Sequence, residues 1–367
     1  MTMAPLRPNS AIAIDGGGIK GLVVARALTA LETELGGGPL IKQPAIKLLT
    51  GTSTGAIITA MIAVGMTADQ IVTKYRSLGQ KVFPPVVPTW LPKALQTFFH
   101  DVLEVVKTSL YSNEEMITIA RGFIGDMTGN PDLTMAQLHD RLGPHKSLIL
   151  TTVNIIERRT QFIKSYTGEF GDWKLWEAII ASASAPIALP VFVKTSAAGK
   201  KCYYTDGGAG SFGNPAYIAA RESISFQGFN PNEITIMSFG TGWVKDAGFA
   251  KSVGQPDQWH ALNWAMNAPL LLIGDVERNQ SLDIIQDFID VDGKGLDFRR
   301  YQFPLETDIE SDAFADNTVY DFMMSLGDKL GAQLRNNQFA PNADPQIDPE
   351  RLYEGWQQRL VATARIK

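Results

Sequence analysis

Two stretches near the start of the sequence share one pattern: a short apolar run, a glycine-rich turn and a longer apolar run. Ala11–Ile14 leads through such a turn into Leu22–Leu28, and Ile46–Thr50 leads through another into Ala56–Val64. Short apolar runs that end at turn residues predict buried strands, and longer runs predict helices. Strands that alternate with helices predict an α/β fold, with a mainly parallel central sheet and helices on both faces.

Later parts of the sequence predict further elements. The runs Leu148–Ile156 and Thr160–Tyr166 flank the polar residues Glu157–Arg159, a pattern typical of a β-hairpin. Ile234–Phe239 is an apolar run that ends at a glycine turn, which predicts another buried strand. After about residue 260 the helical spacing of apolar residues dominates, so we expect helices there.

Composition and charge narrow the class of protein. The 367 residues are 45% hydrophobic and 19% charged, which is enough for a large core, and no apolar run reaches the roughly 18 residues of a membrane span. The first ten residues lack the apolar core of an export signal, so we expect a cytoplasmic protein. The single cysteine, Cys202, excludes an internal disulfide and is predicted to be a buried, inert thiol. A net charge of −5 without a basic run argues against a nucleic-acid polymer as partner, so any membrane contact is expected to be apolar.

The second glycine turn has the sequence of a nucleophile. Ser53 lies in Gly51-Thr52-Ser53-Thr54-Gly55, between the predicted strand and the predicted helix. Glycines on both sides allow the sharp turn that exposes a serine hydroxyl, and the N-terminus of the following helix favours developing negative charge. We therefore predict that Ser53 is a catalytic nucleophile.

The first glycine turn, Asp15-Gly16-Gly17-Gly18-Ile19-Lys20-Gly21, predicts a group of backbone N–H donors at a helix start. Such donors stabilise the oxyanion of an acyl-transfer intermediate, and Gly16, Gly17 and Gly18 are the candidates. The same residues satisfy a dinucleotide fingerprint, but the second strand runs into the serine turn instead of ending in the acidic residue that would bind the ribose. A phosphate loop is excluded, because Lys20 precedes Gly21.

A third turn, Asp206-Gly207-Gly208, follows the run Cys202–Thr205 and supplies a candidate base. A carboxylate within hydrogen-bond reach of a serine hydroxyl can accept its proton directly, and partial burial raises its basicity. The tyrosines before Asp206 are expected to form an apolar wall.

In order and spacing these three turns resemble the patatin-like phospholipases. Ala181–Pro186 and Ile234–Gly242 also resemble family segments that flank the site. The resemblance implies a patatin-like three-layer sandwich and a serine lipid acyl hydrolase with a Ser53–Asp206 dyad and an oxyanion hole at Gly16–Gly18. Supporting motif positions are Asp15, Lys20, Gly21, Gly51, Gly55, Gly207 and Gly208. We expect Lys20 to brace the glycine turn or meet an anionic headgroup, or simply to be solvated.

The same resemblance frames the domain organisation. We expect a catalytic domain over residues 10–335 and a linker with a C-terminal helix over 336–367. Residues 79–112 form an insert whose predicted helix, 91–107, has an apolar side. We favour packing of this helix on the core; the alternative is a lid that engages lipid, with Trp90 at the site entrance.

Several alternatives stay open at this point. A Ser53–Asp206–His260 triad has the chain order of an α/β-hydrolase, although only about two strands precede Ser53; the other histidines, His100, His139 and His145, are weaker candidates. Some bacterial members of the resembled family are switched on by cyclic nucleotides during antiphage defence, and others store or bind rather than catalyse. The expected partners are a phospholipid or other acyl lipid at a membrane surface, with a cyclic-nucleotide activator as a further option. No motif calls for a metal or another cofactor, so we expect calcium-independent activity.

Overall fold

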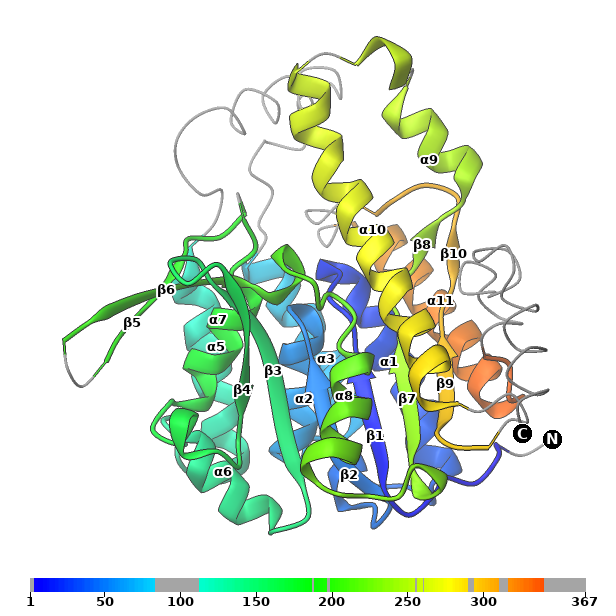
Figure 1. Ribbon diagram of the computed structural model, residues 1–367. Coiled ribbons are helices and arrows are strands. Elements are labelled where there is room, and N and C mark those ends of the chain that lie inside the picture. The colour runs from blue at the N-terminus through cyan, green and yellow to red at the C-terminus, as the bar shows by residue number, and fades with distance from the viewer. Residues whose placement is uncertain are drawn as a thin grey trace, which may run out of the picture.

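The computed structural model describes residues 3–82, 112–186, 188–196, 199–254, 256–259, 261–289, 294–309 and 316–339. Its main sheet has the order β5-β6-β3-β2-β1-β7-β9, with β4 paired to β3 (Figure 1). The strands of this sheet are β1 (Ser10–Ile14), β2 (Ile46–Gly51), β3 (Ser147–Asn154), β4 (Arg159–Lys164), β5 (Phe192–Thr195), β6 (Lys201–Asp206), β7 (Thr235–Phe239) and β9 (Asp297–Tyr301). A separate parallel pair is formed by β8 (Trp243–Val244) and β10 (Pro304–Leu305).

The sheet has a parallel part and an antiparallel part. The β1–β2, β1–β7, β2–β3 and β7–β9 pairs are parallel. The β3–β4, β3–β6 and β5–β6 pairs are antiparallel. The predicted mainly parallel sheet, the hairpin around residues 157–159 and the strand at 234–239 are thus confirmed.

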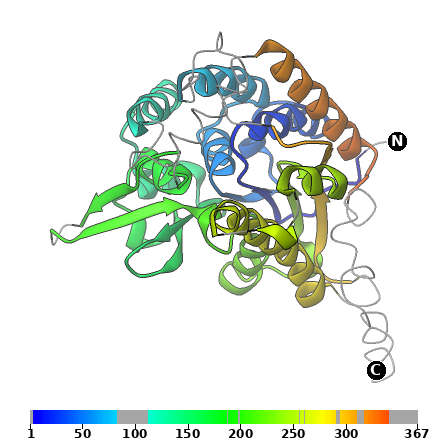
Figure 2. The ribbon, with the colours of Figure 1, turned by 90° about the horizontal axis from the view of Figure 1, so that it is seen from above.

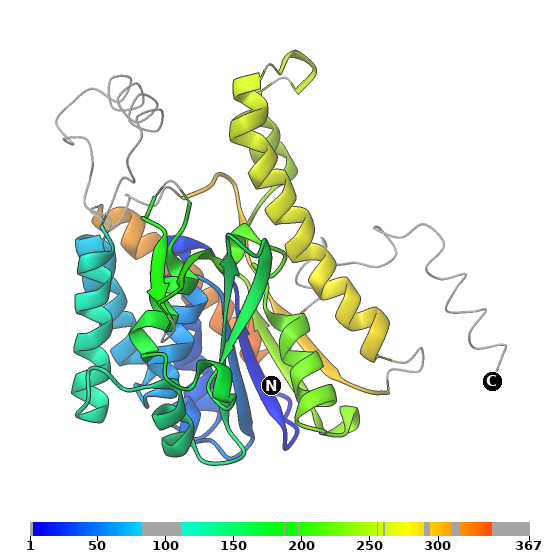
Figure 3. The same cartoon turned by 60° about the vertical axis from the view of Figure 1, so that its left-hand side comes forward.

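Helices cover both faces of the sheet, which gives three layers (Figure 3). The side chains of β1 alternate between the faces: Ile12 and Ile14 join the core under α1, α2, α7 and α11, whereas Ala11 and Ala13 join the core under α8 and α10. The expected α/β sandwich is therefore confirmed. The helices are α1 (Gly21–Glu34), α2 (Thr54–Ala63), α3 (Ala68–Val82), α5 (Asn113–Thr128), α6 (Met135–Leu142), α7 (Leu175–Ala183), α8 (Ala216–Arg221), α9 (Asp246–Val253), α10 (Ala261–Phe288) and α11 (Asn317–Arg335).

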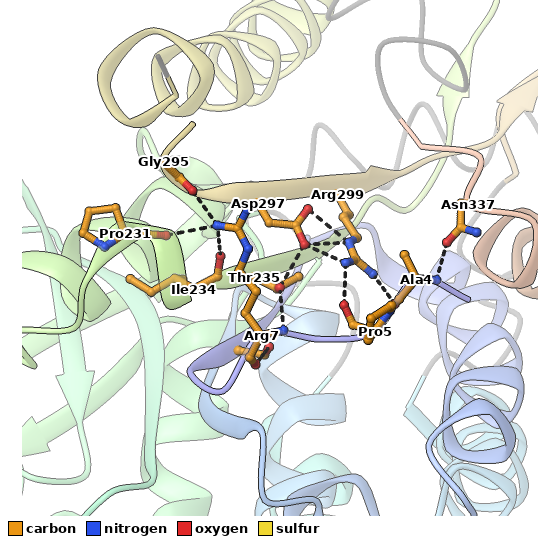
Figure 4. Close-up of polar contacts among 11 residues, drawn as sticks. Ala4, Pro5, Arg7, Pro231, Ile234, Thr235, Gly295, Asp297, Arg299 and Asn337 are labelled. Atoms are coloured by element: carbon orange, nitrogen blue, oxygen red, sulfur yellow. Dashed lines mark hydrogen bonds and ion pairs between the residues drawn. The ribbon is translucent and has the colours of Figure 1, made fainter. Parts of the chain in front are cut away.

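Helices α10 and α11 confirm the expectation that helices dominate after residue 260, and β9 adds a strand that the sequence did not predict. Its sequence, Asp297-Phe298-Arg299-Arg300-Tyr301, carries three charges and reads as polar, yet it pairs with β7 along its whole length. The charges are compensated by local partners: the Arg299 guanidinium donates to Asp297 and to the carbonyls of Ala4 and Pro5 (Figure 4). A strand whose charged side chains find partners only in the folded chain has no hydrophobic signature.

The segment before β1 is fastened to the same edge of the sheet. Arg7 donates to the carbonyls of Pro231 and Ile234 and to that of Gly295, and the Ala4 amide donates to Asn337 after α11 (Figure 4). These bonds join β1, β7 and β9 at the amino-terminal end of the strands. The loops at the opposite end, where the glycine turns lie, therefore start from a fixed framework.

Within the residues that the structure describes, no helix has the length and apolar character needed to cross a membrane. The same residues contain no cluster of three potential metal ligands. The predicted helix over 91–107, Trp90, His100, His260 and the final helix from 349 lie outside the described residues.

Candidate active site

The serine turn and the first glycine turn meet at the carboxyl ends of β1 and β2. These two strands are parallel neighbours, so the turns that follow them lie at the same edge of the sheet. The contact is close: a Cβ atom placed on Gly16 would lie 3.2 Å from the Ser53 Cβ. Glycine at this position leaves room for the serine beside the oxyanion turn.

Ser53 has the backbone of a strained strand-to-helix turn. Its φ of 55° and ψ of −121° are unusual for a residue other than glycine, and α2 begins at the next residue. The turn is tight because a Cβ on Gly55 would come within 2.1 Å of the Ile14 carbonyl oxygen. The Ser53 N–H donates to Ser182 Oγ at 3.1 Å. These contacts fix a half-buried serine at the N-terminus of a helix, the geometry that exposes a nucleophile.

The glycine turn offers two free N–H groups. Gly16 is engaged, because its N–H donates to the Gly213 carbonyl at 3.0 Å. Among the described residues, the N–H groups of Gly17 and Gly18 have no acceptor. Of the three predicted oxyanion donors, only Gly17 and Gly18 have N–H groups available for an acceptor, whereas Gly16 provides space for Ser53.

Two buried or half-buried hydroxyls orient this turn. Thr241 Oγ1 donates to the Gly16 carbonyl at 2.6 Å, and the Tyr75 hydroxyl donates to the Gly18 carbonyl at 2.6 Å. Since a trans peptide is planar, its C=O and the next N–H point in opposite directions, so the Thr241 bond fixes the direction of the Gly17 N–H. Sequence analysis missed this role of Thr241, although the segment that contains it resembles a family segment.

A buried ion pair anchors the start of the turn. Asp15 and Arg300 form a two-fold hydrogen-bonded pair, with Arg300 nitrogens 2.9 and 2.6 Å from the two carboxylate oxygens. Ser238 Oγ accepts a further bond from Arg300 at 2.8 Å. Both charged side chains are buried. Arg300 lies on β9, so a strand that was not predicted from the sequence carries the ion-pair partner of Asp15.

Other charges surround this pair. Glu277 on α10 lies against Gly213; burial, and then the Asp15 carboxylate, raise its pKa to about 8, while Arg300 and Lys20 act to lower it. Lys20 Nζ is 2.8 Å from Asp308 Oδ1, so Lys20 is an ion-paired side chain beside the glycine turn. This contact joins Lys20 to Asp308 and not to the glycine turn, so the expected roles of Lys20 stay predictions.

Asp206 lies at the end of β6, and its two carboxylate oxygens differ in their hydrogen bonding. The residue is buried, and its Oδ1 accepts the Gly208 N–H at 2.7 Å. Its Oδ2 is buried and has no hydrogen-bond partner of regular geometry among the described residues. Burial raises the pKa of Asp206 to about 6, and the Ser53 hydroxyl and the Gly208 amide offset part of that rise. The Ser53 hydroxyl is therefore near enough to act on this carboxyl, in a geometry looser than a formed hydrogen bond.

The end of α7 connects the two candidate residues. Ser182 accepts the Ser53 N–H at 3.1 Å, and the Ser184 carbonyl accepts the Asp206 N–H at 2.9 Å. Thr152 on β3 donates to the Ala181 carbonyl at 2.7 Å, which ties the segment to the sheet. The sequence marked Ala181–Pro186 as family-like without showing that it bridges the site.

The remaining motif glycines lie in close backbone contacts. A Cβ on Gly51 would meet the Gly55 carbonyl at 2.3 Å, and one on Gly207 would meet Thr151 Oγ1 at 2.1 Å. A Cβ on Gly21 would collide with Thr54 and Tyr75, and one on Gly208 would lie 3.1 Å from Asp206 Oδ1.

Strand β6 agrees in part with its predicted features. Tyr204 is buried against Trp173, with ring centroids 5.1 Å apart, and it shares the strand face of Asp206, as an apolar wall requires. Cys202 is only half-buried, so the prediction of a buried thiol was wrong. The reason is its place on the part of β6 that pairs only with the edge strand β5.

No histidine in the described part of the chain is hydrogen-bonded to Ser53 or Asp206. His139 lies on α6 near the Tyr166 ring, at 6.4 Å between centroids, and His145 is exposed. A groove of about 550 Å³ lies between α1 and α11 and contains neither Ser53 nor Asp206. Its lining is mostly polar, so we assign the chemistry to the strand ends and not to this groove.

The fold and the site together define an α/β protein with a serine at a strand-to-helix turn beside a glycine-rich turn. The model of the family described as patatin-like phospholipase matches residues 12–220, and the chain belongs to this family. Membership implies a lipid ester hydrolase.

Relatives of known name agree with this family. A cGAMP-activated phospholipase of Vibrio cholerae is 23% identical over 90% of this chain and 91% of its own length. A cUMP-AMP-activated phospholipase of Escherichia coli is 29% identical over 63% of this chain and 64% of its own length. Among solved structures, VipD from Legionella pneumophila matches with a TM-score of 0.39 and 15% identity, covering 99% of this chain and 74% of that protein.

Proposed function

We propose that this chain is a serine acyl hydrolase that cleaves fatty-acyl esters of phospholipids through a Ser53–Asp206 dyad. The observation that carries the proposal is the state of Asp206: it is buried, the Ser53 hydroxyl influences its pKa, and its Oδ2 has no hydrogen-bond partner of regular geometry among the described residues. A carboxylate with a raised pKa and a free oxygen is suited to accept a hydroxyl proton.

In the first half of the reaction, the Ser53 hydroxyl proton passes to Asp206 Oδ2 while Ser53 Oγ bonds to the ester carbonyl carbon. The negative charge that develops on the carbonyl oxygen is stabilised by the N–H groups of Gly17 and Gly18 and by the N-terminus of α2. The ester C–O bond then breaks. The departing alcohol takes the proton from Asp206, which leaves an acyl-serine and a lysophospholipid.

Water completes the second half of the reaction. Asp206 accepts a proton from water, whose oxygen bonds to the carbonyl carbon of the acyl-serine. Collapse of this second tetrahedral intermediate breaks the bond to Ser53 Oγ and releases the fatty acid. The proton on Asp206 returns to Ser53 Oγ, so the dyad is regenerated without histidine or metal, and activity should persist in a calcium chelator.

The test is release of fatty acid from phospholipid vesicles and hydrolysis of a soluble short-chain p-nitrophenyl ester. We expect both activities to vanish in Ser53→Ala and Asp206→Asn and to survive in His260→Ala and His139→Ala. Loss of activity in His260→Ala would instead support the Ser53–Asp206–His260 triad over the Ser53–Asp206 dyad. A correctly folded chain that hydrolyses neither substrate even with added cyclic dinucleotide, and whose Ser53 does not react with a fluorophosphonate, would instead be a storage or binding protein.

A second candidate is supported by the relatives: an acyl hydrolase that requires a cyclic dinucleotide. The Vibrio and Escherichia relatives are named as phospholipases activated by such molecules. The same assay with and without cGAMP or cUMP-AMP separates the two candidates. Turnover that needs the nucleotide would identify a regulated effector, and equal turnover in both conditions would identify an unregulated hydrolase.

A further inference from the structure

The ribbon of β5 and β6 and the neighbouring β3–β4 turn expose apolar side chains beside the candidate active site. Val193 on β5 is 46% exposed and Val191, just before it, is 41% exposed. In the β3–β4 turn, Ile156 is 64% and Ile155 is 38% exposed. The Ile155 N–H donates to the Tyr203 carbonyl at 2.9 Å, so the turn and the ribbon are continuous. We name these four residues and Tyr203 the ribbon surface.

The exposed residues are the outer face of a two-sided ribbon. Phe192 and Tyr204 pair across the ribbon and pack on Trp173, with ring centroids 6.3 and 5.1 Å apart. Val193 and Tyr203 are the next pair, so they point to the opposite face. The inner face is thus already covered by aromatic side chains, and the outer face carries apolar groups where a solvated ribbon would carry polar ones.

The ribbon surface lies at the end of the sheet that holds the candidate site. Tyr204 pairs with Asn154, the last residue of β3, so residues 201–203 extend past the carboxyl end of that strand. Asp206 closes the same β6 strand. Figures 1 and 2 show the ribbon projecting from the body of the domain. A flat partner that contacts the ribbon surface would therefore lie beside the catalytic end of the molecule.

Basic side chains flank this apolar surface. They are Arg158, Arg159, Lys200 and Lys201. One acidic residue offsets part of this charge, because Glu157 pairs with Arg159 at 2.8 Å. The remaining three are exposed, and none of them forms an ion pair with another described residue. The chain as a whole has a net charge of −5, so this edge of the molecule differs from the rest in carrying an excess of positive charge.

We infer that the ribbon surface docks this protein on an anionic lipid bilayer. The exposed aliphatic side chains and the half-buried Tyr203 enter the boundary between headgroups and acyl chains, and the flanking lysines and arginines contact anionic headgroups. The flanking charge favours a bilayer over a second copy of this positively charged edge, which would repel itself. The inference deepens the proposed function, because docking would hold the Ser53–Asp206 site against its substrate.

Vesicle binding without turnover tests the inference directly. The full chain carrying Ser53→Ala is sedimented with vesicles of phosphatidylcholine, alone or mixed with phosphatidylglycerol. We expect binding to the mixed vesicles that weakens with added salt, and about a tenfold loss of partitioning in Val193→Thr/Ile156→Thr and in Lys200→Glu/Lys201→Glu. Threonine keeps the β-branched shape at both positions, so the ribbon itself is expected to remain.

The matched control is Phe322→Ser, which removes another exposed apolar side chain, 48% exposed, from α11 on a different side of the molecule. This variant should bind vesicles as the parent chain does. If the threonine pair binds as well as this control, or if it instead dissociates a dimer seen by light scattering, the docking inference is overturned.

A soluble ester separates this inference from the proposed function. When the ribbon substitutions are made in the chain that keeps Ser53, all variants should hydrolyse the short-chain ester at the parental rate. A chain that hydrolyses this ester but binds neither vesicle would overturn the docking inference and leave the hydrolase intact. If the chain does not hydrolyse the ester but its vesicle binding is weakened by the ribbon substitutions, the docking inference is supported and the proposed hydrolase activity is rejected.

Discussion

The serine side and the aspartate side of the candidate site are built in different ways. On the serine side, the turns after β1 and β2 are held by a buried ion pair between Asp15 and Arg300, by the Thr241 hydroxyl and by the parallel strands β7 and β9. On the aspartate side, Asp206 ends an antiparallel strand and keeps one buried oxygen unpartnered.

This difference assigns separate physical tasks to the two sides. The unusual backbone of Ser53 and the direction of the Gly17 N–H persist only because surrounding contacts determine them. The basicity of Asp206 has the opposite origin, since burial without full hydrogen bonding raises its pKa. If Ser53 and Asp206 form the proposed dyad, ordered contacts lie where charge is stabilised, and the group that accepts the proton has a buried oxygen without a hydrogen-bond partner of regular geometry among the described residues.

The largest effect is expected on the aspartate side. Asp206→Asn keeps the side-chain oxygen that accepts the Gly208 N–H but removes the proton acceptor, so kcat should fall by at least roughly a thousandfold. The measurement is the rate of soluble ester hydrolysis, with folding checked by circular dichroism. Asp308→Asn is the matched control, because Asp308 is an exposed carboxylate that pairs with Lys20, and it should change kcat by less than about threefold.

The second prediction removes the anchor of the serine side. Arg300→Met leaves the Asp15 carboxylate buried without its partner, so the free energy of unfolding should fall by about 3 to 5 kcal/mol. Chemical denaturation measures this loss. Arg26→Met is the control, since Arg26 and Asp328 are 2.7 Å apart in a pair that is partly exposed to solvent, and its cost should stay below about 1 kcal/mol. Equal costs for the two substitutions would show that the buried pair does not anchor the turn.

The third prediction addresses the direction of the oxyanion donors. Thr241→Val keeps the shape of the side chain but loses the bond to the Gly16 carbonyl, so the Gly17 N–H is free to turn away. We expect kcat to fall by about ten- to a hundredfold with KM nearly unchanged, because the bond to the oxyanion forms only in the transition state.

Thr241→Ser restores the hydroxyl and should recover most of that rate. A purely structural role for Thr241 would give a different result: both variants would lower the melting temperature, and the serine variant would not rescue kcat. The comparison therefore separates orientation of the glycine turn from simple packing against Gly17, whose added Cβ would lie 2.0 Å from Thr241 Oγ1.

The parts of the site that could be predicted from the sequence are those with a local signature. Ser53 and the glycine turns lie where an apolar strand pattern changes to a helical one, and the structure brings Gly16 and Ser53 together as neighbouring parallel strands require. The three layers follow from the same alternation of apolar runs.

The residues that escaped prediction act through long-range contacts. Arg300 is 285 positions from Asp15, and Thr241 is 225 positions from Gly16, so no spacing in the sequence pairs them. Strand β9 was missed for a related reason: its buried arginines look solvent-exposed until their partners are placed. Gly16 was assigned as a donor because a sequence cannot show that the Gly213 carbonyl already accepts its N–H.

The last prediction is the pH dependence that follows from the burial of Asp206. Only the carboxylate can accept the serine proton, so kcat/KM should rise with pH through about 6 and then level off. Glu277→Gln checks the assignment: Glu277 lies near the glycine turn and has a pKa raised to about 8, so its removal should leave the limb near pH 6 in place.

The same shift predicts a stability change of opposite sign to the gain in activity. Folding raises the pKa of Asp206 from 3.8 to about 6, so between these values the folded chain holds a proton that the unfolded chain has released. Stability due to this group is therefore fully present below pH 3.8 and is lost as pH rises through about 6, by up to about 3 kcal/mol at 1.4 kcal/mol per unit. Asp206→Asn has no charge to bury, so its melting temperature relative to the wild type should increase across this window and stay constant above it. A difference that does not vary with pH would mean that Asp206 is ionised in the folded chain throughout, and would remove the physical basis for treating it as the base.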